Sequence, residues 1–134
     1  MRDTLIVYVI ALVIMAALDF SWLSLTSQAL YHRELGPILA DKPNLAAAAA
    51  FYLLYAVGVV VLVIQPALTN GDWKTALVRG TMLGLVAYGT YDLTNMATLK
   101  HWSVKITLID MAWGGFVTAV TASMATLLTL AWQP

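Results

Sequence analysis

The stretch LAAAAAFYLLYAVGVVVLVI, residues 45–64, contains no charged side chain and decides the class of the protein. A helix of this length crosses hydrocarbon that is about 30 Å thick. Three more stretches of similar or greater length, residues 5–25, 76–96 and 104–132, are also mostly apolar. The chain as a whole is 61% apolar and 10% charged, whereas a soluble domain is about 25% charged. We therefore predict an all-α integral membrane protein.

The loops between these four stretches are short, which makes consecutive helices antiparallel neighbours. We predict a single domain over residues 1–134, an antiparallel bundle of four transmembrane helices. Asn44 precedes the second helix and can cap its free N–H groups, and Gln65-Pro66 is predicted to end that helix. The first stretch is too long for the apolar core of a signal peptide and lacks a small-residue cleavage site, so we expect it to remain as a helix.

Charge and residue counts exclude several classes of function. Seven basic and seven acidic residues give no net charge, and without a basic run no nucleic-acid partner is predicted. The chain has no cysteine, which excludes disulfides and thiolate sites. No nucleotide-binding, hydrolase or haem-attachment motif occurs, so no cofactor is predicted. The basic residues divide almost evenly between the two faces of the bundle, so the positive-inside rule assigns no orientation.

Three acidic residues, Asp19, Asp92 and Asp110, lie inside the predicted helices. The first and third helices run toward the face from which the fourth begins, which places all three carboxyl groups at a similar depth in one leaflet. Because the fourth stretch is longer than the hydrocarbon is thick, Asp110 is expected near the headgroup boundary, in a shallow vestibule. Like charges cannot all remain ionised in a medium of low dielectric constant. The three acids are therefore expected to titrate as a set or to hold a cation.

Helical spacing gives each acid aromatic or amide neighbours. Tyr88, Asp92 and Asn95 fall at positions i, i+4 and i+7 and share one face of the third helix. Asp19 and Asp110 are each followed by a tryptophan three residues later, and the second helix brings two tyrosines to the same end. The predicted ligand-binding residues are Asp19, Trp22, Tyr52, Tyr55, Tyr88, Tyr91, Asp92, Asn95, Asp110 and Trp113.

Two functions would use this site. The first is binding or transport of a small cationic or amphipathic ligand or a lipid headgroup, in which the aromatic rings hold the cation and the acids supply charge or exchange a proton. The second is a membrane enzyme that acts on lipid, with Asp19, Asp92 and Asp110 as acid, base or metal ligands. His32 and His101 could join them, but both read as solvated loop residues and no metal-binding spacing occurs, so no metal site is predicted. Whether the protein is an enzyme stays open.

A third function needs no ligand. An acid within the membrane can hydrogen-bond a neighbouring helix and fix its register, as in a structural or assembly subunit. Gly80-x-x-x-Gly84 and Gly115-x-x-x-Ala119 would then be the faces on which copies of the chain meet, and a homodimer is the simplest such assembly.

Four stretches of the chain resemble one family. They are Leu18-Asp19-Phe20-Ser21-Trp22-Leu23, Phe51-Tyr52-Leu53-Leu54-Tyr55, Tyr91-Asp92-Leu93-Thr94-Asn95 with Ala97-Thr98-Leu99, and Ile109-Asp110-Met111-Ala112-Trp113-Gly114. Together they resemble the small bacterial inner-membrane proteins called domain of unknown function 2177, over essentially the whole chain. The resemblance implies a multi-pass, four-span protein of the bacterial inner membrane and assigns no activity.

Overall fold

A computed structural model describes residues 2–132 of the chain and the side chains of residues 4–132. Over this range the regular structure is entirely helical, so the predicted all-α class is confirmed. The helical segments are α1 (Arg2–Thr26), η1 (Ser27–His32), α2 (Arg33–Leu35), α3 (Leu45–Val59), η2 (Val60–Ile64), α4 (Gln65–Asn70), α5 (Trp73–Thr98) and α6 (Val104–Trp132), of which η1 and η2 are π-helical.

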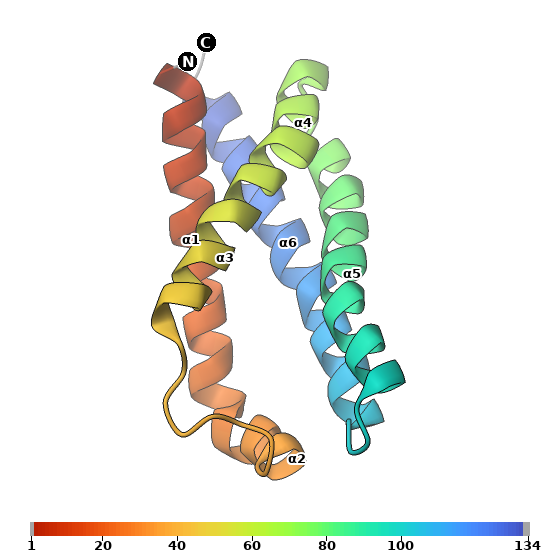
Figure 1. Cartoon of the computed structure of the whole chain (residues 1–134). Coiled ribbons are helices and arrows are strands. Elements are labelled where there is room, and N and C mark those ends of the chain that lie inside the picture. Colours follow the sequence, from red (N-terminus) through yellow and green to blue (C-terminus); the bar gives the residue numbers. More distant parts are fainter. Residues whose placement is uncertain (1, 133–134) are drawn as a thin grey trace.

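These segments join into four rods. The segments α1, η1 and α2 follow one another without a break, as do α3, η2 and α4, while α5 and α6 are each continuous. Consecutive rods run in opposite directions, so that α1 and α5 descend in Figure 1 where α3–α4 and α6 rise. The order is that of an antiparallel bundle of helices.

Three of the rods meet the length and apolarity that a membrane crossing requires. They are Thr4–Leu35, Leu45–Asn70 and Val104–Trp132. Because these three helices are long and apolar enough to cross a bilayer, the chain is a helical membrane protein. At 26 residues α5 is also long enough. Its glycines, its threonines, Arg79 and Asp92 make it less apolar, so the fourth crossing stays a prediction.

The first three helices extend beyond the predicted bounds. The first continues to Leu35, and α5 begins at Trp73, where the Asp72 side chain accepts a hydrogen bond from the Lys74 N–H (2.9 Å). Hydropathy marks the part of a helix that lies in hydrocarbon, whereas the backbone hydrogen bonds continue into the polar layer. The predicted cap of the second helix is present, because the Asn44 side chain accepts from the Ala47 N–H (3.0 Å).

The prediction that Gln65-Pro66 ends the second helix is wrong. Helix α4 continues to Asn70. Gly71 follows it with a φ of 66°, the left-handed backbone conformation that commonly ends an α-helix. Pro66 lies in its first turn, where a missing N–H does little harm. The Leu62 carbonyl of η2 instead accepts a hydrogen bond from Arg79 Nη1 of α5 (3.3 Å), so this side chain stabilises the irregular segment.

Helices α5 and α6 form the most extensive contact of the bundle, and small residues make this possible. A Cβ atom on Gly84 would lie 2.8 Å from the Cα of Gly115, and one on Gly80 would lie 3.0 Å from the Cα of Ala119. Backbones this close require glycine. The two small-residue faces proposed above for contacts between copies of the chain therefore meet each other inside it.

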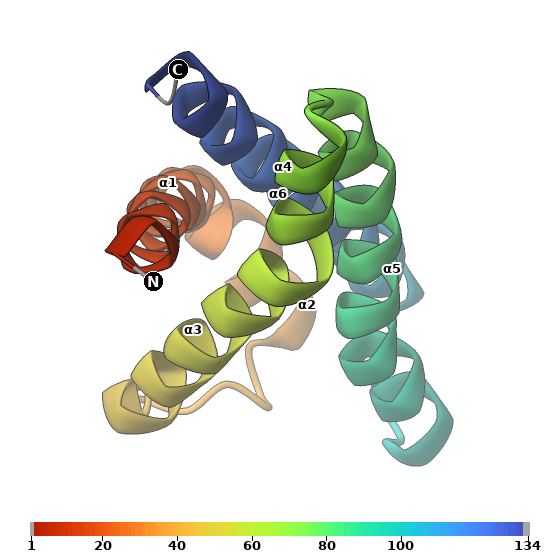
Figure 2. The same cartoon turned by 90° about the horizontal axis from the view of Figure 1, so that it is seen from above.

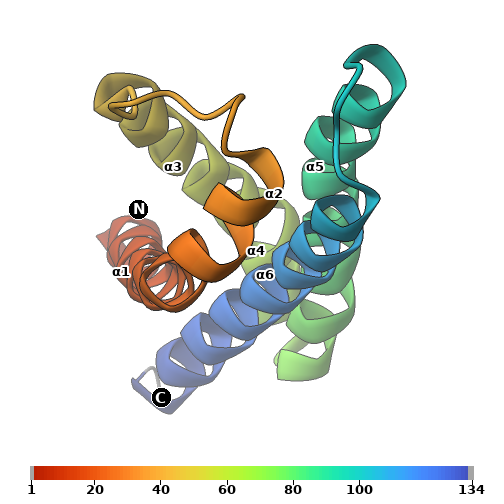
Figure 3. The ribbon, with the colours of Figure 1, turned by 90° about the horizontal axis from the view of Figure 1, so that it is seen from below.

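The other rods pack on this pair less evenly. Helix α1 packs on α6 and α3, and α4 and η2 pack on α5. Seen from above, α3–α4 crosses the bundle obliquely, so that α4 lies beside α5 while the start of α3 diverges from it (Figure 2). At the opposite end, η1 and α2 turn across the bundle, between α1 and the start of α6 (Figure 3). The buried apolar core lies toward the upper half of Figure 1, with residues such as Val7, Ala11, Met15, Val59, Val63 and Ile64.

Candidate functional site

A cavity of about 230 Å³ lies at the end of the bundle that η1 and α2 cross. Every rod contributes to its walls, as does the loop after α2. Of the ten residues predicted to bind a ligand, the structure places eight around this cavity: Asp19, Trp22, Tyr52, Tyr88, Tyr91, Asp92, Asp110 and Trp113. The remaining lining residues are Leu23, Tyr31, Leu35, Leu39 and Ile106.

Asp19 is a buried acid, and each of its two carboxylate oxygens accepts a hydrogen bond. One carboxylate oxygen accepts from Tyr52 Oη (2.8 Å) and the other from Trp113 Nε1 (2.8 Å). These bonds tie α1 to α3 and to α6. Donors aimed at both oxygens compensate the cost of removing the carboxyl group from water, so Asp19 fixes three helices relative to one another.

Asp110 is held by a chain of two donors. Tyr31 Oη donates to Asp110 Oδ1 (2.8 Å), and Trp22 Nε1 donates in turn to Tyr31 Oη (3.0 Å). The indole rings of Trp22 and Trp113 stack at 4.4 Å between centroids with an interplanar angle of 7°. This stack joins the Asp110 network to the Asp19 network.

The Asp–Trp pairs of the sequence exchange partners in the fold. Asp19 and Trp22 lie three residues apart on α1, yet Asp19 accepts its hydrogen bond from Trp113. Trp22 donates to Tyr31, which donates in turn to Asp110. Tyr31 lines the cavity and is not among the predicted residues. The prediction puts its stretch in a loop, whereas the helix continues through η1 and carries the tyrosine over the cavity. The signal that could have found it is the absence of Gly and Pro between Leu25 and Gly36, which allows the helix to continue through this mostly polar stretch.

Asp92 differs from both other acids. Its residue is 0% exposed, and within the described residues neither carboxylate oxygen has a hydrogen-bond partner. Asp110 is its acidic neighbour in the lining of the cavity, close enough for the two carboxyl groups to share a proton. No described Lys or Arg lines this cavity. A buried carboxyl group without a donor costs free energy as an anion, so the pair Asp92 and Asp110 needs a shared proton or a cation between its oxygens.

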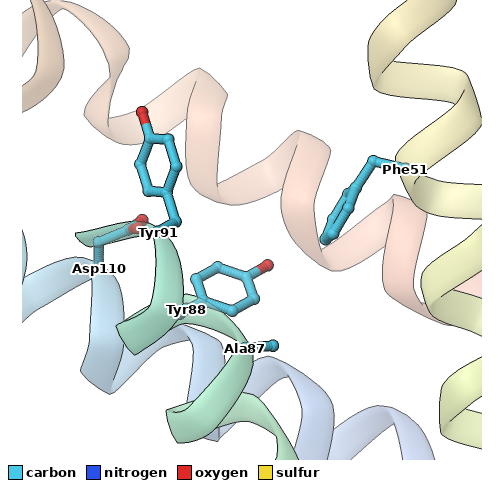
Figure 4. Close-up of a pocket in the computed structure, with 5 residues that line it drawn as sticks. All are labelled: Phe51, Ala87, Tyr88, Tyr91 and Asp110. Carbon is cyan, nitrogen blue, oxygen red and sulfur yellow. The ribbon is translucent and has the colours of Figure 1, made fainter. Parts of the chain in front are cut away.

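A second cavity of about 280 Å³ adjoins the first and shares Tyr88, Tyr91 and Asp110 with it. Its other walls are Ala87 and Phe51. In Figure 4 Phe51 projects from α3 toward this space, and the Tyr88 hydroxyl points toward the side where Phe51 lies. The Tyr91 ring lies beside Asp110 and meets Trp102 edge-on at 5.6 Å. The acidic cavity thus adjoins an aromatic one between α3 and α5.

Two predicted residues lie elsewhere. Tyr55 is 8% exposed and exchanges a hydrogen bond with Thr118 of α6 (2.8 Å), so it belongs to the core. Asn95 lines neither cavity. His32 and His101, the residues weighed as metal ligands, are exposed and lie outside both cavities. In the part of the chain that the structure describes, no three His, Asp or Glu side chains are grouped to hold a metal ion.

The walls of the two cavities define the chemistry that they suit. Carboxyl groups, phenol hydroxyls, indole rings and aliphatic side chains line them, and the described lining contains no amine, imidazole or guanidinium group. Such a surface offers hydrogen-bond acceptors, negative charge and aromatic faces. It complements a cation that carries N–H donors.

The comparisons with known proteins agree with the fold. Residues 4–127 match the family described as "Predicted membrane protein (DUF2177)", a range that contains every residue of the two cavities. No curated protein and no solved structure matches the chain. Since the match extends over all four rods and nearly the whole length, the chain belongs to the predicted membrane protein family DUF2177.

Proposed function

We propose that this protein binds a small organic cation, a protonated amine, in the cavity between Asp92 and Asp110. The observation that carries the proposal is the buried Asp92 carboxyl group, which has no donor among the described residues while Asp110 faces the same space. An ammonium group supplies both the charge and the three N–H donors that these oxygens lack. Binding removes the cost of leaving the acid unpaired.

The size and the walls of the cavity favour an organic cation over a bare metal ion. A volume of about 230 Å³ is several times the roughly 30 Å³ that one water molecule occupies in the liquid. A hard metal ion would need six or more oxygens in a tight shell, whereas these walls are largely indole, phenol and aliphatic. Aromatic faces stabilise cations by about 0.5–2 kcal/mol when water is excluded.

A proton shared by Asp92 and Asp110 is the alternative occupant of the same place. If the cation replaces that proton on binding, uptake of the ligand releases a proton into the medium. The protein would then couple the movement of an amine to that of a proton, as expected for a transporter. We place this activity in the bacterial inner membrane, where the family resemblance puts such proteins.

Calorimetric titration of the purified protein in detergent with ethylammonium tests the proposal. We expect saturable binding to the wild type and a loss of at least about tenfold in affinity in Asp92→Asn, because the neutral amide removes the charge without changing the shape. Asp41→Asn, in an exposed loop, is the matched control and should bind as the wild type does. Equal affinity in all three proteins would overturn the proposal. No binding to a folded wild type would overturn it as well and would favour the structural-subunit alternative.

Repeating the titration in two buffers of different ionisation enthalpy tests the proton exchange. If a proton leaves the Asp92–Asp110 pair, the observed binding enthalpy will differ between the buffers in the wild type. Identical enthalpies would show that the cation binds without displacing a proton.

A further inference from the structure

We infer that the ligand is a single-chain amphiphilic amine, whose ammonium group lies between Asp92 and Asp110 and whose alkyl chain lies in a groove between α3–η2 and α5. This inference rests on the proposed function and names the class of amine. The supporting observation is an apolar groove on the outer face of the bundle that shares Phe51 with the aromatic cavity, which itself adjoins the acidic cavity.

The groove has a volume of about 440 Å³ and is lined by aliphatic and aromatic residues, among them Tyr55, whose hydroxyl bonds to Thr118 in the core. Most of them belong to α3 and η2, and Leu83 of α5 forms the opposite wall. Phe51 lines both this groove and the aromatic cavity, which in turn shares Tyr88, Tyr91 and Asp110 with the acidic cavity. The buried carboxyl groups, the aromatic rings and the apolar surface therefore lie one after another, and this series of adjoining sites is the path that we propose for the ligand.

This path opens sideways to the bilayer. Helix α5 packs on α4, η2 and α6, whereas the first turns of α3 diverge from it (Figure 2). The groove residues are exposed on the outside of the bundle, Leu54 by 72% and Leu62 by 53%. An amphiphile that already lies in the membrane can reach the acids between α3 and α5 without passing through water.

The length of the groove suits an alkyl chain. From Phe51 to Leu62 the rise of a helix amounts to about 16 Å. The lining follows one rod, α3–η2, with Leu83 opposite, and this shape favours one chain over two. Another apolar groove, lined by residues that include Val78, Met82 and Val86 on α5, shares no residue with the aromatic cavity, whereas the proposed groove shares Phe51 with it. The connection to Asp110, rather than apolarity alone, distinguishes the proposed site.

Gly58 provides the means to test the groove. It lies within α3 and lines the groove, and a Cβ atom added there would meet no heavy atom within 4 Å. Glycine weakens a helix interior by about 1 kcal/mol relative to alanine. Gly58→Leu should therefore fill the groove while leaving the fold intact. Val78→Phe, which partly fills the unconnected groove on α5, is the matched control.

The experiment measures binding of ethylammonium and of dodecylammonium to the protein in phosphatidylcholine nanodiscs. Partition of the long amine into the bilayer is the same for all variants, so it cancels when variants are compared. We expect Gly58→Leu to weaken binding of dodecylammonium by about tenfold or more and to leave ethylammonium unchanged. Val78→Phe should change neither.

A photoreactive dodecylamine with a diazirine on its chain identifies where the chain lies. The inference predicts crosslinks to peptides that carry residues 51–62 or Leu83, and their loss in Asp92→Asn. If ethylammonium binds but Gly58→Leu leaves dodecylammonium unaffected, or if the crosslinks fall on the outer face of α5, the groove is refuted and the proposed function stands. If neither amine binds the folded wild type, both proposals are refuted.

Discussion

Asp19 and Asp92 both line one cavity and show how differently a membrane protein can treat a buried acid. Both residues are nearly or fully inaccessible, with exposures of 6% and 0%. Asp19 accepts hydrogen bonds at both oxygens, from donors on two other helices. Asp92 has no such donor within the described residues. Burial alone therefore does not point to a binding site, and our proposal rests on the combination of burial, a missing donor and a place in the cavity wall.

The helices around the two acids differ in the same way. On the Asp19 side, hydrogen bonds between side chains join α1, α3 and α6, so the polar groups themselves hold the helices. On the Asp92 side, glycines allow close backbone contact between α5 and α6, and no donor among the described residues bonds to Asp92. Under the proposed function, this division keeps a costly group where a ligand would bind it.

The largest effect on stability is expected from Asp19→Ala. The substitution leaves Tyr52 Oη and Trp113 Nε1 without an acceptor, and each such group costs about 1–3 kcal/mol, which gives a loss of about 3 kcal/mol. Thermal unfolding in detergent, followed by circular dichroism, measures the change. Asp41→Ala, in the exposed loop, is the control and should unfold as the wild type does. A change as small as that of the control would remove the structural role assigned to Asp19.

A smaller loss is expected from Tyr31→Phe. The variant removes the donor to Asp110 and the acceptor of Trp22 Nε1 while keeping the ring, so the free energy of unfolding should fall by about 1–2 kcal/mol. The same unfolding assay measures it. If the variant is as stable as the wild type, then η1 does not close the cavity through this residue.

Asp92→Asn is expected to change stability in the opposite direction. The amide carries no charge to bury, and its N–H₂ group can donate to the neighbouring Asp110, so the ligand-free protein should become more stable by about 1 kcal/mol. Unfolding without added amine is the assay. A destabilisation like that of Asp19→Ala would show that Asp92 is structural and that the contrast between the two acids is false.

The smallest effect is expected from Tyr55→Phe, which separates core from cavity. The variant loses one neutral hydrogen bond, to Thr118, whose hydroxyl can turn to a backbone carbonyl one turn earlier in α6, so stability should fall by about 0.5–1.5 kcal/mol. Calorimetric titration should give the affinity of the wild type for ethylammonium, because Tyr55 lines neither the acidic nor the aromatic cavity. A tenfold loss of affinity would place Tyr55 in the site after all.

Much of this fold follows from apolar length and helical period. Uncharged and weakly charged stretches predict the helices, Asn44 predicts the start of α3, and the spacing around the acids brings most of the expected residues to one cavity. What sequence periodicity cannot give is the partner on another helix. It pairs Asp19 with Trp22 on the same face, whereas the rotation of α6 brings Trp113 to Asp19 instead.

Other errors have equally local causes. Tyr52 and Tyr55 are three residues apart on α3, but this small angular difference directs one to Asp19 and the other to Thr118. Tyr31 was missed because polar residues beyond the hydrocarbon look like a loop, while the chain continues as a π-helix there. The second predicted helix ends too early at Gln65-Pro66, because Pro66 is tolerated in the first turn of α4, after a π-helical segment.

The contact between amine and acid is the most direct test of the account. Solid-state NMR can measure the dipolar coupling between nitrogen-labelled ethylammonium and the labelled γ-carbons of aspartate in the membrane-embedded protein. The account predicts a coupling in the wild type and in Asp41→Asn that disappears or falls sharply in Asp92→Asn. A coupling that persists unchanged in Asp92→Asn would contradict the claim that Asp92 binds the cation. The absence of a coupling from the wild type saturated with ethylammonium would contradict it as well.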